Sequence, residues 1–399
     1  MTDASGRGGR VEWLASIGRS LLDARHDPAV KPPLQQVREM VRLRRSETEL
    51  SPRDYYDCRI NEIGRFADDD LANVVGRRMR VRLQRMLNNP NWEAVVSDKL
   101  IMAMVFREAG IPQPELVAVA TAYDRSCGEV PVLRTRHEII DFLRHAPLPL
   151  FCKPIRGGYG DSCHRIDTID VQPDTTDTDT DTTDVDGASM TVTIDGGRSM
   201  PIDAFLDELH DASGWGFQFQ KTVRPHPDTI PIAGDAVTGV RMVTLLGDDG
   251  PRLFRAVWKI PSVHSITDNY GDGATGNGVA DVDVTTGAVK GVQWGLGDAS
   301  SVDAPHPDTG THVVGIRVPL WDDVVDQTLA ATRALPGPRF QSWDVGLSST
   351  GPVMFEMNIG GGTWDDVIPR GTYDPQLREF AAAYGHGVQH RRHRGVPRS

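Results

Sequence analysis

Three oxygen-bearing side chains near the end of the sequence have the spacing of a metal site. Glu356 and Asn358 are two residues apart in a strand-like segment, so their side chains should point to the same face. Asp344 lies in the preceding apolar run, and the turn-forming stretch 348–352 predicts a hairpin that brings it beside them. Gathered carboxylates repel each other unless a cation lies between them, and hard oxygen ligands suit Mg²⁺. Taken alone, the pattern fits an ordinary hairpin with a solvated polar face equally well.

A second pattern suits phosphate binding. An apolar strand at 148–153 ends in Lys153 and runs into the glycine-rich segment 156–160. Glycines let backbone amides approach phosphate oxygens, and a lysine supplies a point charge. The segment is neither a Walker loop nor a dinucleotide fingerprint, and alone it is more often a simple turn. Lys99 opens a helix at 97–109 against the helix dipole, which a phosphate-binding role explains, although surface lysines also occur there.

The lysines are few, which gives their positions weight. Only six of the 43 basic residues are lysine, so arginine is the ordinary cation of this chain. A lysine in such a chain suits a site that needs a compact ammonium rather than the planar guanidinium of arginine. The alternative is that any one of these lysines occurs by mutational chance.

Composition excludes several classes of protein. No run of eighteen apolar residues occurs, which argues against a membrane span, and the N-terminus lacks an apolar signal-peptide core, so we expect a cytoplasmic protein. The net charge of −12 argues against general nucleic-acid binding. The four cysteines form no CxxC pair and are interpreted as buried or idle thiols rather than as a metal site or disulfide.

Elements that could position these residues follow from periodicity and turn signals. Residues 1–90 are arginine-rich and predicted to be helical, with helices near 11–24, 34–46 and 68–88 and a start at Ser51-Pro52. Ser97 is expected to cap the helix at 97–109, whose apolar face should include Leu100, Met104 and Phe106. The Asp/Thr-rich segment 171–187 predicts a solvated loop, because so polar a stretch cannot bury a core. A calcium loop is the alternative, but its glycine and terminal glutamate are missing. Further elements are strands at 116–120, 217–223, 239–246, 253–260 and 279–284, and helices at 135–145 and 321–335.

In this order the motifs resemble the ATP-grasp superfamily and, more closely, its sugar-transfer-associated family. They are DKLIMAMVFREAGIPQPE at 98–115, FCKPIRGGYG at 151–160, FQFQKTVRPHP at 217–227, GVRMVTL at 239–245, AVWKI at 256–260, ADVDVTTG at 280–287 and SWDVGL…GPVMFEMNIGGG at 342–362. The resemblance covers roughly residues 50–385. It implies an α+β ATP-grasp fold, in which two α+β lobes with antiparallel sheets clamp ATP. The expected parts are a helical N-terminal region (1–90), a first lobe (91–210), a second lobe with the metal site (211–385) and a basic flexible tail (386–399).

Carried over position by position, the resemblance implies a role for each site residue. The cofactor ATP would be bound by Lys99, Lys153, Gly157, Gly158, Gly160, Gln220, Lys221, Val223 and His226. Arg241, Lys259 and Asn269 would be the catalytic residues. Asp344, Glu356 and Asn358 would hold Mg²⁺, with Mn²⁺ as an alternative.

The implied reaction is that of an ADP-forming carboxylate–amine ligase. A small carboxylate would attack the γ-phosphate of ATP, and an amine or another nucleophile would capture the acyl phosphate, in polysaccharide, cell-surface glycan or small-molecule biosynthesis. A phosphotransferase acting on a hydroxyl and a non-catalytic ATP-binding scaffold are the alternatives, and homodimer formation is left open. Three features depart from the family pattern: no arginine follows Asn358, the loop at 271–278 is long, and the N-terminal region lacks strand–helix alternation.

Overall fold

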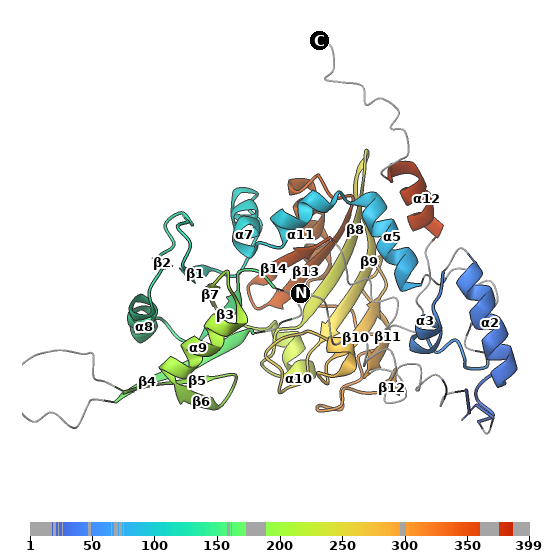
Figure 1. Cartoon of the computed structure of the whole chain (residues 1–399), viewed down its shortest axis with the longest axis horizontal. Coiled ribbons are helices and arrows are strands. Elements are labelled where there is room, and N and C mark those ends of the chain that lie inside the picture. Colours follow the sequence, from blue (N-terminus) through green and yellow to red (C-terminus); the bar gives the residue numbers. More distant parts are fainter. Residues whose placement is uncertain are drawn as a thin grey trace, which may run out of the picture.

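Two seven-stranded sheets form the framework of the computed structural model (Figure 1). The structure describes residues 18–385 except 19–20, 23, 26, 47–48, 65, 68–70, 72–73, 75, 126, 158–159, 161, 173–188, 296–300 and 360–374. Most of the Asp/Thr-rich segment, the basic tail and nearly all of the expected helix at 11–24 therefore lie outside the described residues. Within the described part of the chain, no helix combines the length and apolar character needed to cross a bilayer.

The N-terminal region is helical, as the sequence predicts. It contains α2 (Pro33–Arg45), α3 (Pro52–Asp57) and α5 (Arg77–Leu87). Ser51 caps α3, and its capping box with Asp54 confirms the predicted start of this helix. Helices α2 and α3 share a small core around Leu43, Tyr55 and Ile60, at the end of the molecule away from the first sheet (Figure 1).

The first sheet has the strand order β2-β1-β7-β3-β4-β5-β6, and every pairing except β1–β2 is antiparallel. Its strands are β1 (Leu116–Ala120), β2 (Val132–Leu133), β3 (Leu150–Pro154), β4 (His164–Gln172), β5 (Ser189–Ile194), β6 (Arg198–Pro201) and β7 (Phe217–Lys221). Helices α8 (Arg136–His145) and α9 (Ile202–Ala212) pack on one face through Leu143, Phe205 and Leu209. The first sheet takes in β7, so it extends beyond residue 210, where the sequence analysis ends the first lobe. Strand β7 lies between β1 and β3 rather than beside β8.

The second sheet is antiparallel throughout, with the order β12-β11-β10-β9-β8-β13-β14. Its strands are β8 (Gly239–Gly247), β9 (Gly250–Ile260), β10 (Gly278–Val282), β11 (Val289–Trp294), β12 (Ser301–Val302), β13 (Phe340–Ser348) and β14 (Gly351–Asn358). Helix α11 (Trp321–Ala334) covers one face, where Trp258 and Trp343 are buried. Helices α5 and α12 (Pro375–Tyr384) cover part of the opposite face. The predicted hairpin is confirmed as β13–β14.

Helix α7 (Lys99–Glu108) connects the two cores. Met102 and Phe106 are buried in the core of the second sheet, whereas Leu100 packs with residues of the first lobe. One prediction about this helix is wrong. Asp98 rather than Ser97 is its N-cap, because the Asp98 carboxylate accepts hydrogen bonds from two backbone amides of the first turn. Met104 is only partly buried.

The remaining short elements shape the loops between these strands. They are η1 (Pro90–Trp92), α6 (Glu93–Val96), η3 (Pro227–Thr229), α10 (Ile230–Ala233) and η4 (Gly271–Gly273). Segments from η1 to α7 and from η3 to α10 lie beside the ends of the two sheets, where they border the cleft described below.

Candidate active site

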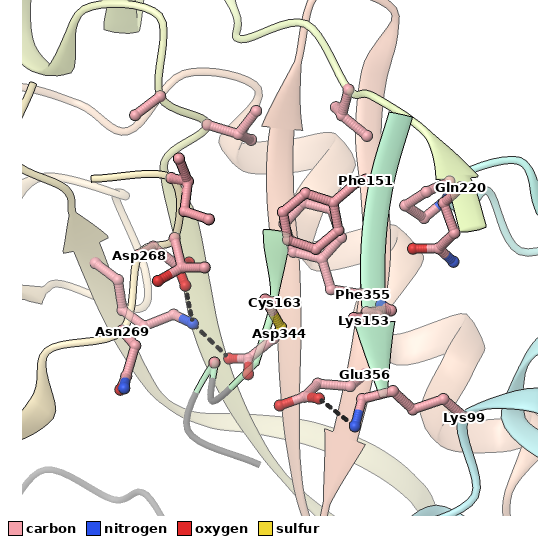
Figure 2. Close-up of a pocket in the computed structure, with 18 of the residues that line it drawn as sticks. Lys99, Phe151, Lys153, Cys163, Gln220, Asp268, Asn269, Asp344, Phe355 and Glu356 are labelled. Carbon is pink, nitrogen blue, oxygen red and sulfur yellow. Dashed lines mark hydrogen bonds and ion pairs between the residues drawn. The ribbon is translucent and has the colours of Figure 1, made fainter. Parts of the chain in front are cut away.

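A cleft of about 1600 Å³ lies between the first sheet and the hairpin side of the second (Figure 2). It brings together thirteen of the predicted site residues: Lys99, Lys153, Gly157, Gly160, Gln220, Lys221, Val223, Arg241, Lys259, Asn269, Asp344, Glu356 and Asn358. Gly158 lies outside the described residues. His226 does not line the cleft, although Pro225 and Pro227 on either side of it do.

The first-sheet wall carries a buried cation, Lys153, that forms no ion pair with a described residue. Phe151 and Lys153 are two residues apart on β3, so both face the cleft. Gln220 of β7, which pairs with Phe151, lines the same wall (Figure 2). The side chain of Lys153 has no hydrogen bond or ion pair with any described residue, and the residue is 8% exposed. Burial, and then the neighbouring charge of Lys99, lower the pKa of Lys153. A buried ammonium of this kind is costly unless an anion reaches it.

Lys99 approaches the same space from the start of α7. Its ammonium donates a hydrogen bond of 2.6 Å to the carbonyl oxygen of Gly157 and lies 3.9 Å from a carboxylate oxygen of Glu356. Asp98, which caps the helix, is held by Arg125 at 3.3 Å and by Arg156 at 3.5 Å. These contacts fix the first turn of α7 against the glycine-rich segment.

The glycine-rich segment reaches across the cleft. Gly157 has φ +144° and Gly160 has φ +72°, conformations that favour glycine. A Cβ atom at Gly160 would lie 3.3 Å from Oγ1 of Thr267 and 3.7 Å from Cβ of Asn269. The segment between β3 and β4 therefore contacts the loop that follows β9 in the other lobe.

The second-sheet wall holds a buried cluster of two cations and two carboxylates. Asp344 of β13 accepts hydrogen bonds from Nε and, at 2.9 Å, from Nη2 of Arg241 on β8. Lys259 of β9 lies 3.2 Å from the same carboxylate and donates a hydrogen bond of 2.9 Å to Asp268. Burial alone would raise the pKa of Asp344, but the two cations outweigh it and hold this pKa below its ordinary value. Burial dominates at Asp268 and raises its pKa.

Asp344, Glu356 and Asn358 converge as the sequence predicts. Asp344 lies directly opposite Glu356 across the hairpin, and side chains of such a pair share one face. The amide of Asn358 donates a hydrogen bond of 3.3 Å to Glu356. Among the described residues, no three His, Cys, Asp or Glu side chains form a metal-binding group by themselves. The oxygens present fit an ion that takes few protein ligands and completes its shell with water and phosphate, as Mg²⁺ does.

Two residues of the predicted adenine-binding stretch have other contacts. The ammonium of Lys221 forms a half-exposed ion pair with Glu115 at 2.7 Å, so its side chain is engaged at the surface. The ring of His226 accepts a hydrogen bond from the backbone N–H of Asp228 at the start of η3. This local cap fixes the His226 ring beside the rim that Pro225 and Pro227 form, and its proposed place near the ribose stays a prediction.

Sequence reasoning missed several residues that line the cleft. Asp268 contacts Lys259, and its second oxygen is buried without a hydrogen-bond partner among the described residues. It can approach because position 239 is glycine: a Cβ atom there would lie 2.0 Å from that oxygen. Gln84 of α5 also lines the cleft, with its amide nitrogen buried and unpartnered within the described structure. No spacing in the sequence signals either residue, because each reaches the cleft only through tertiary packing.

Comparisons with known proteins return one family model and a set of distantly similar solved structures. A family model described as sugar-transfer associated ATP-grasp matches residues 78–371. VanG D-Ala:D-Ser ligase from Enterococcus faecalis is 13% identical, with a TM-score of 0.40 over 72% of this chain and 62% of that one. D-alanine–D-alanine ligase from Bacillus anthracis complexed with ATP is 13% identical, with a TM-score of 0.36 over 76% of this chain and 72% of that one. Biotin carboxylase from Campylobacter jejuni is 9% identical, with a TM-score of 0.40 over 72% of this chain and 46% of that one. The chain thus spans less than two thirds of the first and third of these structures. No curated protein matches the sequence.

Proposed function

The chain belongs to the sugar-transfer associated ATP-grasp family, and we propose that it binds Mg-ATP in the cleft and uses it to activate a small carboxylate. The observation that carries this proposal is the buried ammonium of Lys153, which forms no ion pair with a described residue and has Lys99 close enough to lower its pKa further. Two neighbouring cations at one end of a cleft attract a polyanion, and the charges of Glu356 and Asp344 do not restore the ordinary pKa of Lys153. A triphosphate supplies that charge and suits the compact ammonium of lysine.

The other lining groups would orient the nucleotide. The aromatic ring of Phe151 and the amide of Gln220 lie on the first-sheet wall, where they would contact the adenine together with the backbone of Lys221 and Val223. Backbone groups of Gly157 and Gly160 would approach the phosphates, because neither residue has a side chain in the way. Gly158 of the same segment is proposed on sequence grounds alone.

Asp344, Glu356 and Asn358 would hold the Mg²⁺. When bound, this ion would supply positive charge that neutralises the charge developing during transfer. The chain's own part is to keep the oxygens of this hairpin on one face and to balance Asp344 with Arg241 and Lys259. The fixed geometry of these groups lowers the reorganisation that the transfer requires.

The proposed reaction is that of an ADP-forming carboxylate–amine ligase. A carboxylate oxygen attacks the γ-phosphorus, the bond to the β-phosphate oxygen breaks, and ADP leaves. An amine or another nucleophile then attacks the acyl carbon of the acyl phosphate and displaces phosphate. Arg241 and Lys259 would hold the reacting oxygens, with Asn269 beside them on the loop that contacts Gly160. Polysaccharide, cell-surface glycan or small-molecule biosynthesis would supply such substrates.

A product analysis tests this proposal. The purified chain is incubated with ATP, Mg²⁺, a panel of small carboxylates and an amine, and nucleotides and phosphate are quantified with Lys153→Ala as the comparison. We expect ADP and phosphate to appear together only when carboxylate and nucleophile are both present. AMP and pyrophosphate would contradict the acyl phosphate route. ADP without free phosphate, with a phosphorylated hydroxyl acceptor, would favour a phosphotransferase instead.

A further inference from the structure

Cys163 differs from the other three cysteines in its surroundings. Cys58, Cys127 and Cys152 are buried, whereas Cys163 is partly exposed and lines the cleft (Figure 2). None of the four forms a disulfide. The proposed nucleotide chemistry has no use for a thiol at this position, so its placement calls for a separate explanation.

Cys163 immediately precedes β4, next to the last residue pair of the β3–β4 ladder. Strands β3 and β4 are antiparallel, and Phe151 pairs with Arg165 and Cys152 with His164. Continuing this register by one residue sets Lys153 against Cys163. Directly opposed residues share one face of a sheet, with Cβ atoms about 4.5–5.5 Å apart.

The neighbouring pair confirms the alternation. Cys152 belongs to the core on the helix-covered face of the sheet. Its partner His164 packs edge-on against Phe205 of α9 and contacts Asp195 at 2.9 Å. Lys153, the next residue of β3, therefore points to the opposite face. Cys163, the residue before β4, lines the cleft on that same face.

An ammonium without an anionic partner favours the thiolate form of an adjacent cysteine, and the thiolate is the nucleophile. Lys153 is more than nine-tenths buried and forms no ion pair with a described residue, so its charge acts on the Cys163 sulfur as well as on the more distant carboxylates of Glu356 and Asp344. Cys152, on the same strand, provides the contrast. Burial raises the pKa of its thiol, and no path from solvent leads to it.

We propose that Cys163 is a reactive thiol that forms a mixed disulfide with small disulfides, and that this adduct blocks the phosphate end of the cleft. The thiolate of Cys163 attacks one sulfur of the disulfide, a new S–S bond forms, and the original S–S bond breaks. The leaving thiolate takes up a proton from solvent, so no further oxidant is needed. The adduct would lie opposite Lys153, and a reducing thiol would reverse it. The blocking step rests on the proposed nucleotide site, whereas the reactivity of the thiol does not.

The test uses the full chain with oxidised glutathione as the probe. Intact-mass measurements follow the rate of adduct formation, and peptide mapping locates the adduct. We expect one adduct, at Cys163, which is absent from Cys163→Ser and retained in Cys58→Ser. Lys153→Met should slow the reaction by about tenfold or more, and Lys153→Arg should restore much of the rate, because the positive charge stabilises the thiolate.

Separate outcomes overturn each half of the proposal. An adduct at another cysteine, or a Lys153→Met rate equal to that of the wild type, would refute the assigned reactivity. Mg-ATP should protect Cys163, and calorimetry should show lost ATP affinity after modification and recovery after reduction. Unprotected labelling in a chain that binds ATP would refute the blocking step. Failure to bind ATP at all would refute the proposed function, while the labelling rates would still decide whether the thiol is reactive.

Discussion

The buried cluster on the second-sheet wall predicts a large loss of stability for Asp344→Asn. Asparagine keeps the shape of the side chain but removes its charge, which leaves Lys259 with Asp268 and leaves Arg241 with the charges of Glu356 and Asp268. Breaking a buried ion pair costs about 3–5 kcal/mol. The lower end applies here, about 3 kcal/mol, because Lys259 keeps its contact with Asp268 and asparagine still accepts a hydrogen bond. In a unit of about 150–250 residues, that cost lowers Tm by roughly 6–12 °C.

Thermal unfolding of the purified variants measures this effect. Asp322→Asn is the matched control, because Asp322 pairs with Arg317 at 2.7 Å on the surface of the same lobe. Solvent and salt screen exposed pairs, so this control should shift Tm far less. Equal shifts in the two variants would refute the view that Asp344 is the centre of a buried charge cluster.

The pH dependence of the same comparison provides a second check. The pKa of Asp344 is lower in the folded chain than its ordinary value, so its contribution to stability is present above the unfolded pKa of about 3.9. This contribution disappears as the pH falls through the folded pKa. The Tm difference between wild type and Asp344→Asn should therefore have its largest value near neutral pH and should decrease only below the unfolded pKa. A difference that grows as the pH falls would contradict this sign.

Three further changes test other parts of the site. Glu356→Gln should lower substrate-dependent ADP release far more than ATP affinity, because correctly placed metal ions matter most in the transition state; equal ADP release in both proteins would eliminate the proposed metal role. ATP affinity should fall as the pH rises through the lowered pKa of Lys153, because only the ammonium attracts the phosphates, and calorimetry should show that this pH dependence is absent from Lys153→Met. Gly239→Ala should cost about 1–3 kcal/mol in urea unfolding, because the new Cβ atom meets Asp268; an unchanged midpoint would show that this close approach does not occur.

Local sequence patterns predict the elements that carry the site. The hairpin follows from two alternating apolar runs around a turn, and the same alternation places Asp344 and Glu356 on one face. The start of α3 follows from Ser51 and the proline after it. These predictions succeed because each depends on residues that are close together in the sequence.

Features that depend on distant contacts are not predictable in this way. A strand-like run at 217–221 looks the same whether it joins one sheet or the other, so the sequence does not reveal that β7 lies between β1 and β3. Helix α7 has two candidate caps in succession. Asp98 is the N-cap, and its carboxylate is held by Arg125, which lies 27 positions away in the sequence.

The two walls of the cleft differ in charge balance, and this difference suggests that they have different roles in binding and reaction. On the second-sheet wall, Arg241 and Lys259 are already matched by two carboxylates, so these groups are held in place before any ligand arrives. On the first-sheet wall, Lys153 has no such partner. Under the proposed function, the unbalanced wall attracts the polyphosphate and the balanced wall supplies a preorganised surface against which it reacts. The same imbalance would activate the thiol of Cys163 whenever the nucleotide is absent, so occupancy of the phosphate end and reactivity of the thiol should exclude each other.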